Sequence, residues 1–153
     1  MIRNSAKAII FHEGKILFIK MLKDNKNYYI LPGGGQDKFE NLQEAVLREC
    51  LEETGYAVKV LDILFVRDYI AKNHEFGLID PGFHQVEFMF ECRIDSSIDQ
   101  VQATMRDLHQ IDLEWVALNE LRSKNIYPKI LREKIPLYYE GKGARVIYLG
   151  DVN

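Results

Sequence analysis

The stretch that decides the fold covers residues 31–56 and reads LPGGGQDKFENLQEAVLRECLEETGY. It joins a turn of three glycines to a segment with three clustered glutamates, Glu49, Glu52 and Glu53. Glycine allows positive φ angles and the close approach of other groups to the backbone. Carboxylate oxygens are ligands that Mg²⁺ prefers. The stretch therefore predicts a site that holds a divalent cation against a phosphate chain.

The second half of this stretch is expected to form a helix. Asn41 followed by Glu44 three residues later resembles a capping box, and Gly55 supplies a stop signal. At about 100° per residue the three glutamates share one face of that helix. Leu47 and Leu51 fall near the opposite side, so we expect them to be buried.

A solvated acidic face is the ordinary explanation for a glutamate-rich helix. Here a wider pattern argues against it: a glycine, five residues, Glu, seven residues, Arg-Glu, an apolar residue, any residue, Glu-Glu, any residue, Gly and an apolar residue. The matching positions are Gly34, Glu40, Arg48, Glu49, Cys50, Glu52, Glu53, Gly55 and Tyr56. With this pattern the chain resembles the Nudix hydrolases, and the only departures are mild ones, Cys50 and Tyr56 at the two apolar positions.

The resemblance implies a single domain over residues 1–153 of the α+β class, an α/β/α sandwich around a mixed β-sheet. It also implies an enzyme that cleaves a diphosphate bond in a nucleoside diphosphate derivative. A modified nucleoside triphosphate, a nucleotide sugar and an ADP-ribose-like molecule all stay open as substrates. The implied cofactor is Mg²⁺, with Mn²⁺ as a substitute. The alternative is a catalytically silent Nudix module that senses a nucleotide.

By resemblance, the metal ligands are Glu49, Glu52 and Glu53, with the backbone carbonyl of Gly33 as a candidate additional ligand. Arg48 is expected to orient Glu49 or Glu52, and an ordinary surface ion pair is the alternative. We expect Arg48 to reach Glu40, Glu44 or Glu52; Glu40 is expected to serve as its structural partner rather than as a base.

The general base is left open between two sources. One source is a glutamate of the family pattern, which we call a box glutamate, Glu52 or Glu53. The other is a glutamate outside the pattern: Glu87, which lies on the alternating segment 83–93, with Glu75 and Glu91 as further candidates. An ordinary position on a strand surface is the alternative for Glu87. The expected catalytic set is therefore Glu53, Glu52, Arg48 and Glu87.

Substrate contacts are expected from two regions. Gly34 and Gly35 allow the close approach of a phosphate chain. Arg67 is expected to pair with a phosphate and Tyr69 to stack on a base, with a strand-end ion pair and a core-edge aromatic as the alternatives. The residues Tyr28, Tyr29, His74, Phe76, Phe83 and His84 are weaker candidates for the same cleft.

Other segments predict a strand-rich chain with a second helix. We expect strands at residues 6–11, 15–19, 28–31, 58–69, 83–93, 114–117 and 145–149, a polar loop at 71–82, and helical segments at 119–125 and 129–135, with Pro128 in a first helical turn.

Composition limits the class of protein. A net charge of -3 gives no overall attraction for nucleic acid, so nucleic acid is not an expected partner. The resemblance to the Nudix hydrolases implies a nucleotide-derived small molecule as the partner. No apolar run approaches the ~20 residues that span a bilayer, and the first residues lack a signal-peptide layout, so a cytoplasmic location is expected. The two cysteines are expected to be free thiols in the core. The sequence also leaves a homodimer open as a partner.

Overall fold

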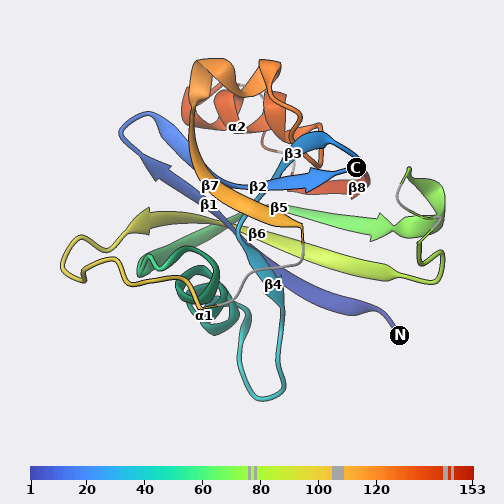
Figure 1. Cartoon of the computed structure of the whole chain (residues 1–153), viewed down its shortest axis with the longest axis horizontal. Helices are drawn as coiled ribbons and strands as arrows, with labels where there is room; N and C mark the ends of the chain where they lie inside the picture. Colours follow the sequence, from blue (N-terminus) through green and yellow to red (C-terminus); the bar gives the residue numbers. More distant parts are fainter. Residues whose placement is uncertain (76, 78, 105–108, 143–144, 146) are drawn as a thin grey trace.

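The computed structural model describes residues 1–75, 77, 79–104, 109–142, 145 and 147–153. Within these residues one mixed sheet contains eight strands, in the order β3-β2-β1-β6-β5-β8, with β4 paired to β1 and β7 paired to β2 (Figure 1). The strands are β1 (Arg3–His12), β2 (Lys15–Lys23), β3 (Lys26–Ile30), β4 (Gly33–Gly35), β5 (Val58–Ile70), β6 (His84–Ile94), β7 (Gln110–Ala117) and β8 (Tyr148–Asp151). The pairs β1–β6 and β5–β8 are parallel, and the other pairs are antiparallel.

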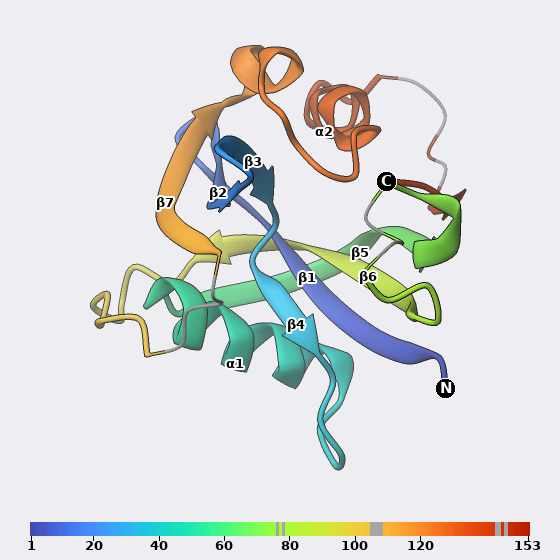
Figure 2. The same ribbon diagram turned by 45° about the vertical axis from the view of Figure 1, so that its right-hand side comes forward.

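Helices cover both faces of this sheet. The α-helices are α1 (Leu42–Thr54) and α2 (Leu131–Tyr139), and the short 3₁₀ helices are η1 (Ala71–Asn73) and η2 (Leu118–Ser123). Helix α1 lies on one side of the sheet, and α2 lies with η2 on the other side, as the turned view also shows (Figure 2). The predicted α/β/α sandwich around a mixed sheet is confirmed.

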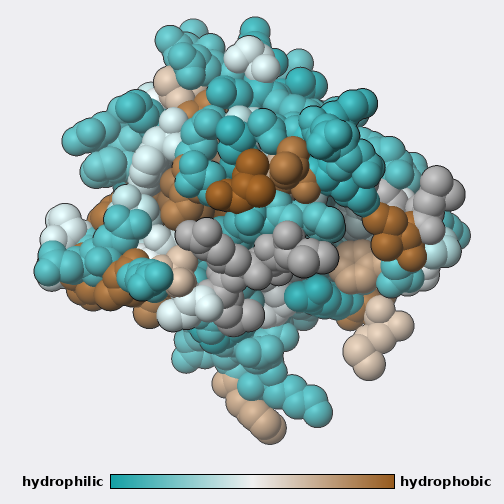
Figure 3. Space-filling view, in the orientation of Figure 1, coloured by the Kyte–Doolittle hydropathy of each residue, from teal (hydrophilic) through white to brown (hydrophobic). Residues whose placement is uncertain are grey.

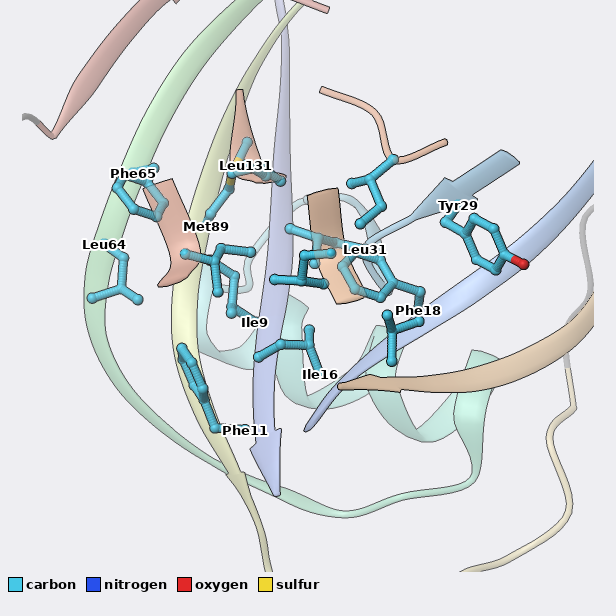
Figure 4. Packing of buried hydrophobic residues seen from close by; sticks show 14 residues of the cluster. Ile9, Phe11, Ile16, Phe18, Tyr29, Leu31, Leu64, Phe65, Met89 and Leu131 are labelled. Atoms are coloured by element: carbon cyan, nitrogen blue, oxygen red, sulfur yellow. The ribbon is translucent and has the colours of Figure 1, made fainter. Parts of the chain in front are cut away.

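The two faces of β1 explain the two halves of the core. Ile9 and Phe11 belong to the cluster that includes residues of α2, part of which is shown in Figure 4. Ala6, Ala8 and Ile10 belong to the cluster that includes residues of α1. Because successive side chains of a strand point to opposite faces, this alternation places one strand between both helical layers.

The ends of α1 are formed as its sequence predicts. The Asn41 side chain accepts from the backbone of Glu44, and the Glu44 side chain accepts from the backbone of Asn41, which completes a capping box. Gly55 adopts a φ of 74° and ends the helix. Glu44 is therefore engaged in capping and is not the partner of Arg48.

The expected burial of Leu47 and Leu51 is wrong. Their exposed fractions are 43% and 42%, whereas Val46 and Cys50 are completely buried. The contact face of α1 is centred on the i, i+4 pair of Val46 and Cys50, and each leucine follows one residue later, about 100° around the helix.

The other elements differ from expectation mainly at their ends. The helical segment predicted at 119–125 is the 3₁₀ helix η2, which covers Leu118–Ser123. Helix α2 begins at Leu131 and extends beyond Pro136, so Pro128 precedes the helix instead of lying in its first turn. The last strand runs from Tyr148 to Asp151, and Phe76 lies outside the described residues.

The surface and the cysteines agree with the composition. The face in Figure 3 is largely hydrophilic and carries only small, separate hydrophobic areas. None of the helices in the described part of the chain is long and apolar enough to cross a membrane. Cys50 and Cys92 are buried free thiols, as predicted, and burial raises the pKa of Cys92 to about 12.

Candidate active site

The glycine turn forms β4, which lies directly against β1. Gly33 pairs with Lys7 and Gly35 pairs with Ser5 in an antiparallel register. Gly33 has a φ of 136°, and a Cβ there would collide with the carbonyl oxygen of Ala6. Glycine is required at this position because both the backbone conformation and the strand contact exclude a side chain.

Helix α1 is joined to this turn by Glu53. The buried Glu53 carboxylate accepts a hydrogen bond from the backbone N–H of Gly33 at 2.7 Å through Oε1. Gly34 lies beside the side chain of Glu49: a Cβ at Gly34 would be 2.5 Å from Oε1 of Glu49. The glycines therefore let the carboxylates of α1 approach the backbone of β4.

Arg48 connects the glutamates with the turn. Its guanidinium donates to both carboxylate oxygens of Glu40 at 3.0 and 2.6 Å, to Glu49 at 2.9 Å and to Glu52 at 3.3 Å. It also donates to the carbonyl of Gly35 at 3.0 Å. The hydrogen bonds with Glu40 are the main reason that the pKa of Arg48 is raised, and they lower the pKa of Glu40 in turn.

A pocket of about 360 Å³ opens between the turn and the helix, and we call it the carboxylate pocket. Its lining includes Glu49 and Glu53 together with Gly33 and Gly34. The structure thus brings together four of the predicted site residues. Glu52 is held by Arg48 and is not among the residues that line this pocket.

Three polar side chains of β1, two of them cationic, also line the carboxylate pocket, and the sequence did not identify them as site residues. Arg3, Ser5 and Lys7 line it, and the ammonium group of Lys7 donates to the carbonyl of Gly33 at 3.0 Å. The predicted strand began at Ala6, so Arg3 and Ser5 lay outside it. The signal was partial: Ser5 and Lys7 alternate with the buried Ala6 and Ala8, which indicates that the strand starts before Ala6 and that Arg3 shares their face.

The donor set fits a hard divalent cation. In the part of the chain that the structure describes, no group of three or more His, Cys, Asp or Glu side chains is already arranged to hold a metal ion. The carboxylates of Glu49 and Glu53 nevertheless face one pocket together with the backbone of Gly33, and such oxygen ligands suit Mg²⁺. Their present partners are Arg48 and the Gly33 N–H, both of which donate hydrogen bonds.

A second pocket, of about 220 Å³, adjoins the first, and we call it the aromatic pocket. Lys7 and Gln85 line both pockets. The lining of the aromatic pocket also includes Tyr28, Arg67, Tyr69, Glu87, Tyr127 and Asn153. The predicted contacts Arg67, Tyr69 and Glu87 therefore lie together beside the carboxylate pocket.

Glu87 and Arg67 form a buried ion pair in the wall of the aromatic pocket. The Nε atom of Arg67 donates to Glu87 at 2.6 Å, and Gln85 donates to the other carboxylate oxygen at 2.6 Å. Burial alone raises the pKa of Glu87, but the charges of Arg67 and Lys7 and these hydrogen bonds together hold it below its ordinary value. Glu87 is therefore an ionised carboxylate with firm partners.

Among the weaker candidates, Tyr28 lines the aromatic pocket and Phe83 lines the carboxylate pocket, whereas the two histidines have protein partners of their own. His84 contacts Asp68 at 2.7 Å and His74 contacts Asp151 at 2.7 Å. The ring of Tyr69 is stacked on His74, with 5.4 Å between the ring centroids. These contacts fix the edge of the aromatic pocket, and no signal in the sequence identified Asp68 or Asp151 as partners.

Comparison with known proteins decides the family. The family model described as NUDIX domain matches residues 1–137, which contain both the glutamate helix and the glycine turn. The chain belongs to the NUDIX domain family. It is thus a Nudix hydrolase, and the prediction of a pyrophosphohydrolase enzyme is confirmed.

Relatives of this Nudix protein are similar over most of its length. Phosphatase NudJ of Shigella boydii serotype 4 (strain Sb227) is 26% identical over 147 residues, which cover 95% of this chain and 88% of the relative. A MutT NUDIX hydrolase from Burkholderia pseudomallei has a TM-score of 0.61 and 28% identity, over 78% of this chain and 85% of the other. A NUDIX hydrolase from Nitrosomonas europaea has a TM-score of 0.71 and 19% identity, with 95% and 94% coverage, which shows the same fold.

Proposed function

We propose that this Nudix hydrolase cleaves a diphosphate bond in a nucleoside diphosphate derivative and depends on Mg²⁺, with Mn²⁺ as a substitute. One observation carries the proposal: Glu49 and Glu53 line the same pocket as Arg3 and Lys7. Carboxylates beside cations are unsuited to an apolar ligand, and they suit a polyanion that is bound together with a divalent cation. The reaction adds one water molecule across a phosphorus–oxygen–phosphorus bridge and yields two phosphate products.

The cation is proposed to be held by Glu49, Glu52 and Glu53, with the carbonyl of Gly33 as a further ligand. When bound, it would neutralise phosphate charge and so favour attack by water. The carbonyl of Gly33 now accepts from Lys7, which places a positive charge at the same position. Arg48 positions this set through its bonds to Glu49 and Glu52.

The phosphate chain is proposed to lie between the two pockets. Arg3 and Lys7 are placed to contact its oxygens, and the uncovered backbone of Gly34 and Gly35 lets the chain approach closely. Lys7 belongs to both pockets, so it can hold the phosphate that connects the cleaved bond to the nucleoside.

The proton of the attacking water is proposed to pass to a box glutamate, Glu53 or Glu52. The contacts of Glu87 support a positioning role for this residue, which holds Arg67 in the aromatic pocket. Its lowered pKa makes it a weaker base than an ordinary carboxylate.

The nucleoside or the attached group is proposed to bind in the aromatic pocket, against Arg67 and Tyr69. A further groove of about 500 Å³ shares Tyr28 and Tyr127 with this pocket, which leaves room for a bulky second group. Nucleotide sugars and ADP-ribose-like molecules fit this layout, and a modified nucleoside triphosphate fills less of it. A cytoplasmic location and a homodimer stay proposals from the sequence.

A substrate panel tests the proposed function. Nucleoside triphosphates (including oxidised ones), ADP-ribose, nucleotide sugars and dinucleoside polyphosphates are each incubated with Mg²⁺, with Mn²⁺ or with EDTA, and the products are separated by chromatography. We expect at least one class to be cleaved with either ion and none with EDTA. Inertness towards the whole panel, or cleavage that EDTA leaves unchanged, would overturn the proposal.

A further inference from the structure

Gly35 is a glycine that neither the family pattern nor its own backbone conformation requires. The pattern begins at Gly34, and the positive φ of the turn belongs to Gly33. The space that a side chain at Gly35 would take is filled by the guanidinium of Arg3. A Cβ at Gly35 would lie 2.4 Å from Nη2, 2.6 Å from Nε and 2.9 Å from Cζ of Arg3. Glycine therefore gives the Arg3 guanidinium a place directly against the turn.

The charge of Arg3 is not compensated, unlike that of the other arginines of the site. Arg48 forms ion pairs with three glutamates, and Arg67 is paired with Glu87. Among the residues that the structure describes, the guanidinium of Arg3 has neither a hydrogen-bond partner nor an ion-pair partner. A guanidinium carries five N–H donors in a planar fork that matches the oxygens of a phosphate. Arg3 is therefore available to an anionic ligand.

The strand register places Arg3 at one end of a row that crosses both pockets. Tyr69 of β5 is the register partner of Gln85 of β6, and Gln85 is the partner of Arg3 on β1. Gln85 lines both pockets, Tyr69 lines the aromatic pocket and Arg3 lines the carboxylate pocket. Because neighbouring strands lie about 4.8 Å apart, the two ends of the row are about 10 Å apart. A ligand that reaches from Tyr69 to Arg3 therefore crosses from one pocket into the other.

Lys7 divides this path into two parts. It lines both pockets, whereas Arg3 shares only the carboxylate pocket with Glu49 and Glu53. When the nucleoside lies against Tyr69, the phosphate attached to it meets Lys7, and the next phosphate lies in the carboxylate pocket. Two carboxylates repel that second phosphate, so it needs cationic donors there in addition to a bound cation.

We propose that Arg3 is a specificity-determining residue that binds the second phosphate of the substrate, counted from the nucleoside. Lys7 binds the first phosphate, so the bond to be cleaved lies between the two cationic side chains. Arg3 then selects molecules with a diphosphate over molecules with a single phosphate. The inference rests on the proposed function in taking the aromatic pocket as the nucleoside end and the carboxylate pocket as the phosphate end.

Calorimetric titration of the full chain with Mg²⁺ present tests this inference without catalysis. The ligands are the monophosphate and the α,β-methylene diphosphate of the same nucleoside, in an adenosine series and a uridine series. A methylene group in place of the bridging oxygen prevents cleavage. Arg3→Met retains an apolar side chain but no donor. We expect it to weaken the diphosphate analogue about tenfold, the scale of a charge-assisted hydrogen bond, and to leave the monophosphate within twofold.

Gly35→Ala tests the same contact from the other side. Its Cβ must displace the guanidinium of Arg3, which is the far end of a flexible side chain. We expect a weaker loss in the same direction, again for the diphosphate analogue only. This variant decides the matter if thermal melting shows that Arg3→Met is not folded.

Arg122→Met is the matched control. It removes the same charge from η2, where Arg122 lines a separate pocket with Leu118 and Tyr139. Both ligands should bind to it as they bind to the wild type. Arg3→Lys retains a charge without the planar fork, and it should lose less affinity for the diphosphate analogue than Arg3→Met.

Three results would overturn the inference. Equal losses for both ligands in Arg3→Met would show a general effect of charge, and no loss for either would place the second phosphate elsewhere. A wild type that binds the diphosphate analogue no better than the monophosphate in both series would exclude a second phosphate site. The substrate panel is decided separately: an inert panel with a selective loss in Arg3→Met would reject the reaction and retain the phosphate site, and an active panel with equal losses would do the reverse.

Discussion

Gly34→Ala should separate catalysis from stability. A Cβ at Gly34 would lie 2.5 Å from Oε1, 2.6 Å from Cδ and 2.8 Å from Oε2 of Glu49. Ordinary contact begins at 3.4 Å, so the Glu49 carboxylate must retreat by about 0.9 Å. The displaced group is the far end of a flexible side chain, so the fold can adapt at small cost.

The catalytic cost should be much larger than the cost in stability. A displacement of about 1 Å in a reacting geometry can reduce the rate about 10²-fold. We therefore expect kcat to fall about 10²-fold on the best substrate of the panel with Mg²⁺. The free energy of unfolding should fall by about 1 kcal/mol or less, on the scale of one weakened hydrogen bond between Glu49 and Arg48.

Steady-state turnover and urea unfolding of the same preparation measure the two effects. Gly82→Ala is the matched control, since a Cβ there meets nothing closer than Asp80 at 3.5 Å, and it should leave both quantities unchanged. Turnover of Gly34→Ala within twofold of the wild type would show that the position of the Glu49 carboxylate does not matter, and the assignment of the carboxylate pocket would be rejected.

Three other substitutions probe the site and its surroundings. Glu53→Gln retains an oxygen that can accept from Gly33 but loses the charge, so we expect kcat to fall at least about 10²-fold with little change in melting temperature; near-normal turnover would remove Glu53 from the site. Arg48→Lys keeps one charge but not the two-point contact with Glu40, so urea unfolding should show a loss of about 1–3 kcal/mol, and no loss would contradict the organising role of Arg48. Asp151→Asn should lower stability at pH 7: burial raises the pKa of this carboxyl, but hydrogen bonds outweigh it and hold the pKa at about 2, below the ordinary value of 3.8. The contribution of that carboxylate is present above the unfolded pKa of 3.8 and is lost as the pH falls through the folded pKa of about 2. The deficit of the variant should therefore shrink between about pH 5 and about pH 2, and a constant deficit over that range would exclude this cause.

The glutamate helix was predictable because its signals are local. The capping box at Asn41, the stop at Gly55 and the contacts of Arg48 with Glu40 and Glu52 depend on residues only a few positions apart in the chain. The spacing of the family pattern, from Gly34 to Tyr56, was enough to predict the family and, through the family, the sandwich fold. Local periodicity was misleading where tertiary packing decides, as at Leu51, which the helix leaves 42% exposed.

The remaining part of the site depends on contacts between distant segments. Arg67 and Glu87 were both identified from sequence, but their mutual ion pair follows from the register of β5 against β6. Lys7 reaches the pocket through the pairing of β1 with β4. Asn153 reaches it because β8 docks beside β5, 85 residues or more from its partner Arg67 along the chain. No local pattern encodes such pairings.

Cation binding tests the central claim most directly, because it does not require the substrate to be known. Chelator-treated wild type and the double variant Glu49→Gln, Glu53→Gln are melted across a Mg²⁺ titration and, separately, a Mn²⁺ titration. Binding to the folded state alone stabilises by about 2.7 kcal/mol at a hundredfold excess over Kd. We predict a saturable rise in the melting temperature of the wild type that the double variant lacks. Equal shifts in the two proteins, or no shift in either with millimolar cation, would contradict the claim that these glutamates hold the catalytic ion.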